Sequence, residues 1–473
     1  MPDRWRALAV LACTQFLLIL DTAIINVAVP SIGTDLGISP AGLSWVANAY
    51  LIAFGGLLLL GGRAADHLGR RRIFLAGLVV LIAGSALGAV AGSTGWLVAG
   101  RAVQGVAAAL AAAAALALVL GIFPDGPERH RALGVFAAMA GAGGAVGTVL
   151  GGVLTDWFGW RSTFVLNVVA GVLLVVVSLR FVPDVRRTRP GGGFDVAGAV
   201  TVTTGLGLLA YGLVSAGEVG WLAPRVLVAG GLAVLALVGF ALVERRASGP
   251  LVPLGVLRRR TLRTANLLAA LGQLTLFPMF FFVSIYLQDV VGHSPLGGGL
   301  GLLPLSLLVI VVAGAADRVI ARFGLRTVMV AGFALVTAGM TWLSAALDVD
   351  GGFVTGVLGP SLVLAVGLPL VSITTNVAAT AEAGPEEAGL ASGLINTSQQ
   401  FGAVLGLAVM AGVVAARGGA PADGGTADPV ALTAGIRTAF LVGAVVALLA
   451  AIAAVRLRRA PAPAAEQPVA SAR

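Results

Sequence analysis

The sequence has no lysine, one cysteine and few charged residues. Charged residues make up 11% of the 473 residues, whereas a soluble globular protein carries roughly 25%. Without lysine there is no Gly-x-x-x-x-Gly-Lys phosphate loop, which excludes an ATP-driven pump. The lone Cys13 excludes an intramolecular disulfide. Three scattered histidines form no metal cluster, so we expect no metal site, no cofactor and no enzyme.

Most residues of the chain are hydrophobic. They make up 58% of the chain, and the mean hydropathy is +1.00. Apolar runs of about 18 residues or more recur throughout, which is the length that a helix needs to cross a bilayer. The alternating segments of a β-barrel are absent. The sequence therefore predicts an all-α polytopic membrane protein embedded in the lipid bilayer.

About fourteen transmembrane helices are predicted, and arginines mark their orientation. The spans are 8–33, 44–62, 73–92, 96–123, 131–155, 163–182, 195–215, 222–243, 264–287, 297–316, 327–347, 353–380, 388–415 and 437–456. Arginine clusters fall in alternate loops, as the positive-inside rule requires of the cytoplasmic side. We therefore expect a multi-pass protein of the cytoplasmic membrane with both termini in the cytoplasm. Because the net charge of +9 comes from loop arginines, we expect no nucleic-acid binding.

Two arginine- and proline-containing segments, 181–194 and 244–263, bracket the seventh and eighth spans and leave six spans on either side. We expect an N-terminal six-helix bundle over 1–183, a linker with two extra transmembrane helices over 184–263 and a C-terminal six-helix bundle over 264–459. The tail 460–473 is rich in alanine and proline, and we expect it to be disordered. Two related halves around a central site are typical of a transporter.

A charged loop between the second and third spans recurs between the tenth and eleventh. The first copy contains Gly62, Asp66, Gly69, Arg70 and Arg71, and the second contains Asp317, Arg318 and Arg322. An aspartate can pair with arginines or with a helix end, so both loops are candidates for gates that control cytoplasmic closure. The alternative is that these charges only anchor the loops at the lipid headgroups.

The first loop resembles the signature loop of the major facilitator superfamily, and other motifs resemble the same family. In the fourth span Arg101, Gln104 and Gly105 share one helix face, which resembles the Arg-x-x-Gln-Gly motif implicated in proton relay. The fifth span carries the glycine groove of the antiporter motif, with Thr148 where the family usually has proline. The groove consists of Gly143, Gly147, Gly151 and Gly152.

Within the first span, the segment from Leu20 to Pro30 resembles the signature of the fourteen-span drug:proton antiporter branch. The resemblance implies that Asp21 and Arg101 couple transport to protons. A buried carboxyl group ionises less readily, so one inside a span can exchange a proton near neutral pH. The alternative is a structural Asp21 bonded to Asn26 or to a neighbouring helix. The segment 160–167 resembles the conserved start of the sixth span of the family. Two later segments, 194–198 and 391–402, resemble the same fourteen-span branch.

The resemblance covers nearly the full length and implies a proton-driven exporter of small, largely hydrophobic compounds such as drugs or antibiotics. It implies two six-helix bundles that alternate access to a central cavity, working as a monomer, with a small-molecule substrate and protons as partners. The residues expected to line the cavity are Asn26, Gln104, Asn396 and Gln400. A narrow-range metabolite exporter, an uptake symporter and a non-transporting receptor stay open as alternatives.

Overall fold

The computed structural model describes residues 2–124, 126–184, 195–247, 250–251, 259–380, 388–418 and 428–456. All regular structure in these ranges is helical, and fourteen of the helices are long and apolar enough to cross a membrane. The predicted all-α membrane fold is therefore confirmed. The predicted tail 460–473 and most of the arginine-rich segment 181–194 lie outside the described residues.

The helices divide by order into six, two and six. The first six are α1 (Pro2–Leu36), α2 (Pro40–Leu68), α3 (Arg70–Ala89), α4 (Thr94–Ile122), α5 (Pro127–Phe158) and α6 (Arg161–Phe181). The next two are α7 (Val196–Val219) and α8 (Pro224–Arg246). The last six are α9 (Arg260–Ile285), α10 (Pro295–Phe323), α11 (Leu325–Ala346), α12 (Gly359–Thr380), α13 (Ala388–Gly418) and α14 (Pro429–Val455), with π-helical turns at Tyr286–Val290 and Val354–Leu358.

Local sequence signals repeat at equivalent places in the two halves. Both α2 and α10 begin with a serine N-cap followed by proline, since Ser39 and Ser294 accept from the backbone N–H three residues on. Both end at a glycine of positive φ, Gly69 at 109° and Gly324 at 81°, a conformation that disfavours side chains with a Cβ. The two helices that lead into the repeated loops thus begin and end by the same backbone chemistry.

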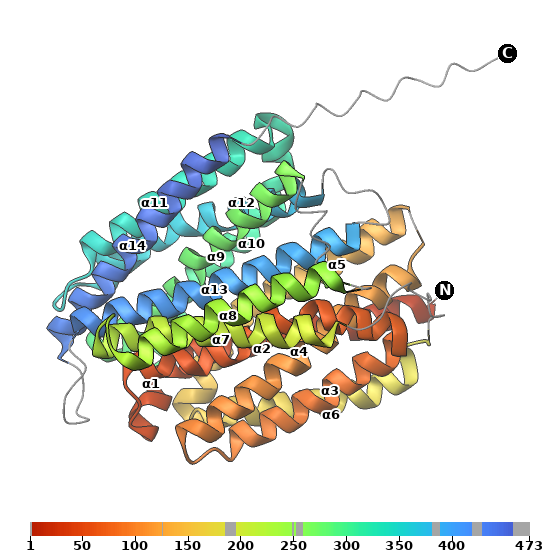
Figure 1. Ribbon diagram of the computed structural model, residues 1–473, viewed down its shortest axis with the longest axis horizontal. Coiled ribbons are helices and arrows are strands. Elements are labelled where there is room, and N and C mark those ends of the chain that lie inside the picture. Colours follow the sequence, from red (N-terminus) through yellow and green to blue (C-terminus); the bar gives the residue numbers. More distant parts are fainter. Residues whose placement is uncertain are drawn as a thin grey trace.

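Each set of six helices packs mainly on itself. In the N-terminal half α1 packs along α5, and α4 packs between α2 and α3; in the C-terminal half α9 packs along α13, and α11 packs against α12 and α14. The halves meet where α2 lies against α13 and α5 lies against α10 (Figure 1). We call the side at which α1 begins and α14 ends the terminal face, and the other side the opposite face.

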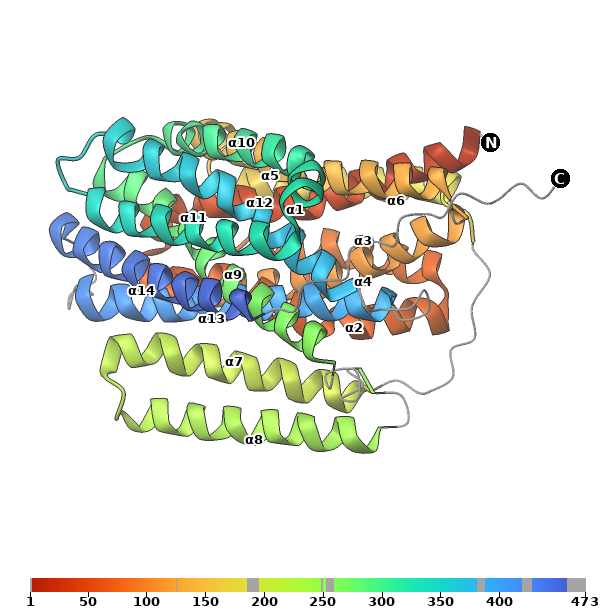
Figure 2. The same ribbon diagram turned by 90° about the horizontal axis from the view of Figure 1, so that it is seen from above.

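The α7–α8 hairpin forms a separate layer beside both halves (Figure 2). α7 contacts α2 and α13, whereas α8 packs mainly on α7. Adjacent glycines of α2 make this possible: Gly55 faces Gln400 of α13, and Gly56 faces Thr203 of α7, with no room for a methyl group at either position. The hairpin therefore covers the seam between the halves from one side.

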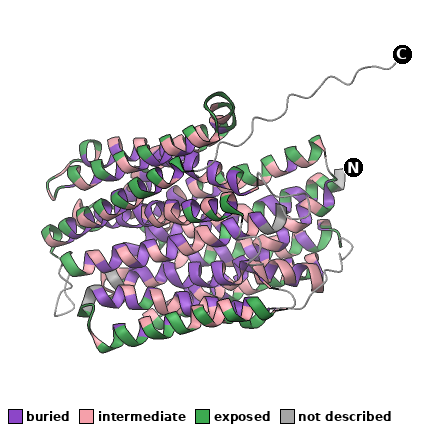
Figure 3. Cartoon of the chain, turned by 45° about the horizontal axis from the view of Figure 1, so that its top comes forward, coloured by how far each residue is buried: buried purple, intermediate pink, exposed green. Residues whose placement is uncertain are grey.

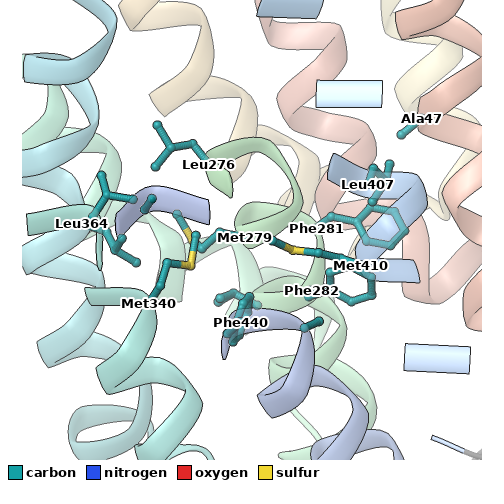
Figure 4. Packing of buried hydrophobic residues seen from close by; sticks show 14 of the residues in the cluster. Ala47, Leu276, Met279, Phe281, Phe282, Met340, Leu364, Leu407, Met410 and Phe440 are labelled. Atoms are coloured by element: carbon teal, nitrogen blue, oxygen red, sulfur yellow. The ribbon is translucent and has the colours of Figure 1, made fainter. Parts of the chain in front are cut away.

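Buried residues run through the middle of the helix assembly, and exposed residues line the outer surfaces of its helices (Figure 3). The largest cluster of buried hydrophobic residues lies mostly in the C-terminal half, with methionine and phenylalanine side chains from α9, α11, α13 and α14 (Figure 4). These include Met279, Phe282, Met340, Met410 and Phe440. In the N-terminal half, by contrast, alanine is the commonest buried residue of α4.

Candidate functional site

A cluster of charged and amide side chains lies buried in the N-terminal half. Nη1 of Arg101 donates to Oδ2 of Asp21 at 2.6 Å and to Oε1 of Gln104 at 2.8 Å. Nδ2 of Asn167 donates to Oδ1 of Asp21, and Nε2 of Gln104 reaches the same oxygen at 3.4 Å. Gln104 also donates to Oγ of Ser85 at 2.8 Å. The structure thus brings together the three sequence-predicted residues Asp21, Arg101 and Gln104.

The guanidinium of Arg101 is fixed from two further directions. Nε donates to the carbonyl oxygen of Val46 at 3.1 Å, and the guanidinium carbon lies 4.5 Å from the centre of the Tyr50 ring. Both partners lie one helical turn apart on α2, so that one face of α2 supports the arginine. Arg101 therefore has little freedom to leave the carboxylate without a change in how α2 and α4 pack.

Glycines permit this convergence of helices. A methyl group at Gly105 would overlap the carbonyl oxygen of Tyr50, and one at Gly84 would lie 2.9 Å from the backbone nitrogen of Gln104. α4 therefore approaches α2 and α3 at backbone distance, which places the Gln104 side chain between them. The Gly-Ser pair at 84–85 thus provides both close packing and a hydroxyl partner.

The ion pair is shielded from solvent: the side chains of Arg101 and Asp21 are 1% and 2% exposed. Removing one member of a buried pair leaves an uncompensated charge, at a cost of roughly 3–5 kcal/mol. Buried ion pairs add little net stability, so they are weak evidence for a purely structural role. In a membrane helix, ionisable residues are a functional-site hypothesis by default.

The glycine groove of α5 lies directly beside this cluster. Gly143, Gly147 and Gly151 face α1 at Phe16, Leu20 and Ile24, without space for larger side chains. Gly152 faces the other way, since a methyl group there would lie 2.9 Å from Cα of Leu296 in α10. One helix therefore contacts both the helix that carries Asp21 and the other half of the molecule.

The two repeated loops differ in their contacts. Asp66 is paired with Arg70 at 3.0 Å, while Arg70 also donates to the carbonyl oxygen of Ala117 and Arg71 to that of Leu179. The first loop thereby ties α2 and α3 to the terminal-face ends of α4 and α6. In the second loop Asp317, Arg318 and Arg322 are exposed, and no salt bridge joins them to any residue in the described ranges.

The remaining predicted cavity residues lie apart from the cluster. Asn26 is buried, and its Oδ1 has no hydrogen-bond partner within the described part of the chain. Asn396 is exposed and donates to the carbonyl oxygen of Ser392, one turn earlier in α13. Gln400 is half-buried next to Gly55, where the two halves meet. The structure thus does not bring these three residues into the cluster around Asp21, and their role in a cavity stays a prediction.

Sequence reasoning missed three members of the cluster: Asn167, Ser85 and Tyr50. The segment 160–167 was noted only as a family resemblance, although an amide within a span is itself a signal. Ser85 and Tyr50 carry no pattern that distinguishes them from ordinary span residues. Their role depends on which helices pack together, and this is not visible in the local sequence.

A hollow of about 530 Å³ opens on the terminal face. It is lined by Trp5, Pro127, Glu128 and Arg131, and the Arg131 guanidinium lies 5.2 Å from the Trp5 ring. Trp5 and Asp21 are separated along α1 by roughly 24 Å at 1.5 Å per residue. This hollow is therefore separate from the buried cluster.

The halves pack closely near the opposite face and separate towards the terminal face. The carbonyl oxygen of Thr148 faces Gly299 across the α5–α10 contact, and Nε2 of Gln288 donates to the carbonyl oxygen of Val27 at 2.9 Å. Towards the terminal face the helix ends of the two halves diverge (Figure 1). The seam is thus closed at one face and more open at the other.

Comparisons with known proteins agree with this architecture. The Major Facilitator Superfamily profile matches residues 11–407. The cephamycin export protein CmcT of Amycolatopsis lactamdurans is 40% identical over 88% of this chain and 86% of its own. The puromycin resistance protein pur8 of Streptomyces alboniger is 39% identical over 86% and 81%.

Solved structures share the fold at low sequence identity. A bacterial homologue of the human lysosomal transporter Spinster superposes with a TM-score of 0.68 at 17% identity, covering 98% of this chain and 100% of its own. A D-xylose–proton symporter superposes with a TM-score of 0.68 at 14% identity, covering 96% and 97%. The family profile, the relatives and the fourteen-helix fold together show that this chain belongs to the major facilitator superfamily of membrane transporters.

Proposed function

We propose that this transporter exports small, largely hydrophobic compounds, drugs or antibiotics among them, in exchange for protons. The observation that carries the proposal is the buried pair of Asp21 and Arg101, which places one ionisable carboxylate in the interior of a transporter half. The names of the relatives support export, because they describe cephamycin export and puromycin resistance.

The distribution of arginines supports a cytoplasmic terminal face. At the opposite face lie Arg161, Arg225, Arg417 and Arg437, whereas the other described arginines except Arg101 lie towards the terminal face. By the positive-inside rule, we expect both ends of the fourteen-helix array to lie in the cytoplasm. With this orientation, the seam that is open towards the terminal face corresponds to a state that accepts substrate from the cytoplasm.

The exchange would proceed by competition at the cluster. In the state described, Asp21 is held by Arg101 and two amides, so an arriving proton or substrate has to compete with these contacts. The rocking of one half on the other would open the seam near Gln288 and close it near the repeated loops. The substrate path would follow the seam past Asn26, Asn396 and Gln400.

Substrate-triggered proton release in inverted membrane vesicles tests this function, with cephamycin, puromycin and cationic dyes as the panel. We expect release by the wild type and none by Asp21→Asn, with equal membrane insertion of both. Release that survives in Asp21→Asn would remove this carboxylate from the coupling step. Substrate uptake driven in the opposite direction would favour the symporter alternative, and binding without transport would favour a receptor.

A further inference from the structure

Only one of the two polar atoms in the Asn167 side chain has a hydrogen-bond partner among the described residues. Its Nδ2 donates to Oδ1 of Asp21, whereas its own Oδ1 is buried and has no hydrogen-bond partner within the described part of the chain. The residue is 1% exposed. A buried amide oxygen without a partner costs free energy, and such groups are rare in native proteins. The orphaned oxygen therefore requires an explanation.

The two carboxylate oxygens of Asp21 are not equivalent. Oδ2 lies 2.6 Å from Nη1 of Arg101, a guanidinium that does not lose its proton in proteins. Oδ1 faces the uncharged amides of Asn167 and Gln104. A proton taken from solvent would therefore settle on Oδ1, converting the carboxylate into a neutral carboxyl group while Oδ2 keeps its contact with Arg101.

Protonation turns Oδ1 of Asp21 from a hydrogen-bond acceptor into a donor. An ionised carboxylate only accepts, but a protonated one presents an O–H donor at the same position. The N–H of Asn167 would then face another donor, while its orphaned oxygen is the acceptor that the O–H needs. A half-turn about χ2, a broad two-fold torsion in asparagine, exchanges the two ends of the amide.

We propose that Asn167 is a positioning residue that stabilises both protonation states of Asp21 by turning its amide. This role rests on the proposed proton coupling. The charged or titratable groups at the cluster are Arg101 from α4 and the Tyr50 phenol from α2. Within the described residues, the charged side chains of α3, α5, α6, α9 and α10 lie towards the helix ends. Gln104 can also donate and accept, but its Oε1 already accepts from Arg101 and its Nε2 donates to Ser85. In this part of the chain, Asn167 is thus the amide beside Asp21 whose acceptor is unused.

The start of α6 is held rigidly enough for such a role. Nη1 of Arg161 donates to Oδ2 of Asp35 at 2.8 Å, and Nε1 of Trp160 donates to the same oxygen at 3.1 Å. Nη2 of Arg161 also donates to the carbonyl oxygen of Ala91 at 2.9 Å. α6 is thus tied to α1 near the opposite face as well as at Asp21. The amide can turn while the two helices keep their spacing.

The first test is the pH profile of substrate-triggered proton release for Asn167→Leu. A hydrogen bond to the charged form is about twice as strong as one to the neutral form, so losing both should raise the midpoint by about one pH unit. Asn167→Gln, which keeps an amide, should return the midpoint towards that of the wild type. Asn48→Leu is the matched control, since Asn48 is a buried amide of α2 outside the cluster.

The second test is difference infrared spectroscopy of the carboxyl stretch of protonated Asp21, assigned by its loss in Asp21→Asn. We expect this band to move to higher frequency in Asn167→Leu and in the less bulky Asn167→Ala, because the O–H has lost its acceptor. An unchanged band and midpoint in a folded variant would overturn the role of Asn167 and leave proton coupling intact. Absence of the band and of proton release in the wild type would overturn the proposed function, and this role with it.

Discussion

The two six-helix halves bury different chemistry within the same architecture. The N-terminal half encloses the ion pair of Asp21 and Arg101 with its amide partners. Among the described residues of the C-terminal half, the buried polar side chains are uncharged: Asn266, Thr275, Ser284, Ser306, Ser361, Thr374, Thr375, Thr397 and Thr433. Several of their hydroxyl groups simply donate to carbonyl oxygens of their own helix, as Thr374 and Thr433 do.

Because of this difference, a transporter can keep its proton chemistry in one half while the packing of the other half adjusts during movement. Among the described residues of the two halves, buried charge is confined to one cluster. The C-terminal half instead has methionine and phenylalanine packing (Figure 4), which adapts its contacts without breaking polar bonds. Between described residues, the hydrogen bond of Gln288 to Val27 is the one that joins the two halves directly. Rocking the halves therefore disrupts few directional interactions.

The largest predicted effect comes from breaking the charged cluster. Arg101→Gln leaves the Asp21 carboxylate buried without its cation, so we expect a loss of roughly 3–5 kcal/mol of stability together with complete loss of transport. The double variant Asp21→Asn/Arg101→Gln lacks both charges. We expect it to recover most of the lost stability but to remain inactive in transport. Thermal unfolding of the purified protein and vesicle transport measure the two quantities separately.

Two outcomes would break the comparison between the halves. If Arg101→Gln unfolds at the wild-type temperature, the pair is not buried as strictly as 1% and 2% exposure indicate. If the double variant stays as unstable as the single one, the loss comes from packing around the arginine stem rather than from the unpaired charge.

The sequence predicted the fold well, because the information is local. Span length and arginine placement are each readable within about twenty residues. Part of the cluster was also predictable, since Arg101 and Gln104 share a helix face. Asn167, Ser85 and Tyr50 were not, because they come from three other helices and their meeting depends on close contacts at Gly84 and Gly105. Asn396 and Gln400 stay predictions as cavity residues.

The second effect concerns the repeated loops. Asp66 is paired with Arg70 in this state, whereas Asp317 is exposed and unpaired within the described residues. We therefore expect Asp66→Asn to change the balance between the two access states severalfold and Asp317→Asn to change it less. Leu296 lies where the halves pack closely, so a cysteine in its place is covered while the seam is closed at the opposite face. The rate at which this cysteine is labelled from the opposite face therefore reports the balance between the two states. The background needs only Cys13→Ser.

Equal changes in labelling for the two loop variants would mean that the second loop gates as strongly as the first in the alternate state. Unchanged labelling in both would support the simpler role of these charges as headgroup anchors. Either result is informative, because the helices that lead into the two loops begin and end alike while the loops differ in their ion pairing.

The third effect is smaller and lies at the seam. Gln288→Leu removes the hydrogen bond to the carbonyl oxygen of Val27, which is worth about 0.5–1.5 kcal/mol, or roughly a two- to twelvefold shift in population. We expect faster labelling of the cysteine at 296 from the opposite face. Ser294→Ala, which alters only the N-cap of α10, controls for local loosening. If both variants label equally fast, the hydrogen bond does not hold the seam closed.

The last comparison takes one buried hydroxyl group from each half. Ser85 accepts from Gln104 at 2.8 Å, so Ser85→Ala leaves a buried amide donor with only a long contact to Asp21, at a cost of about 1–3 kcal/mol. Thr374 donates to the carbonyl oxygen of Leu370 in its own helix, so Thr374→Val removes a donor and leaves that carbonyl in its backbone bond. We expect a clear drop in unfolding temperature for Ser85→Ala and almost none for Thr374→Val. Equal losses would show that the C-terminal half depends on its hydroxyl groups as much as the N-terminal half depends on its cluster. The two halves would then differ only in their buried charge.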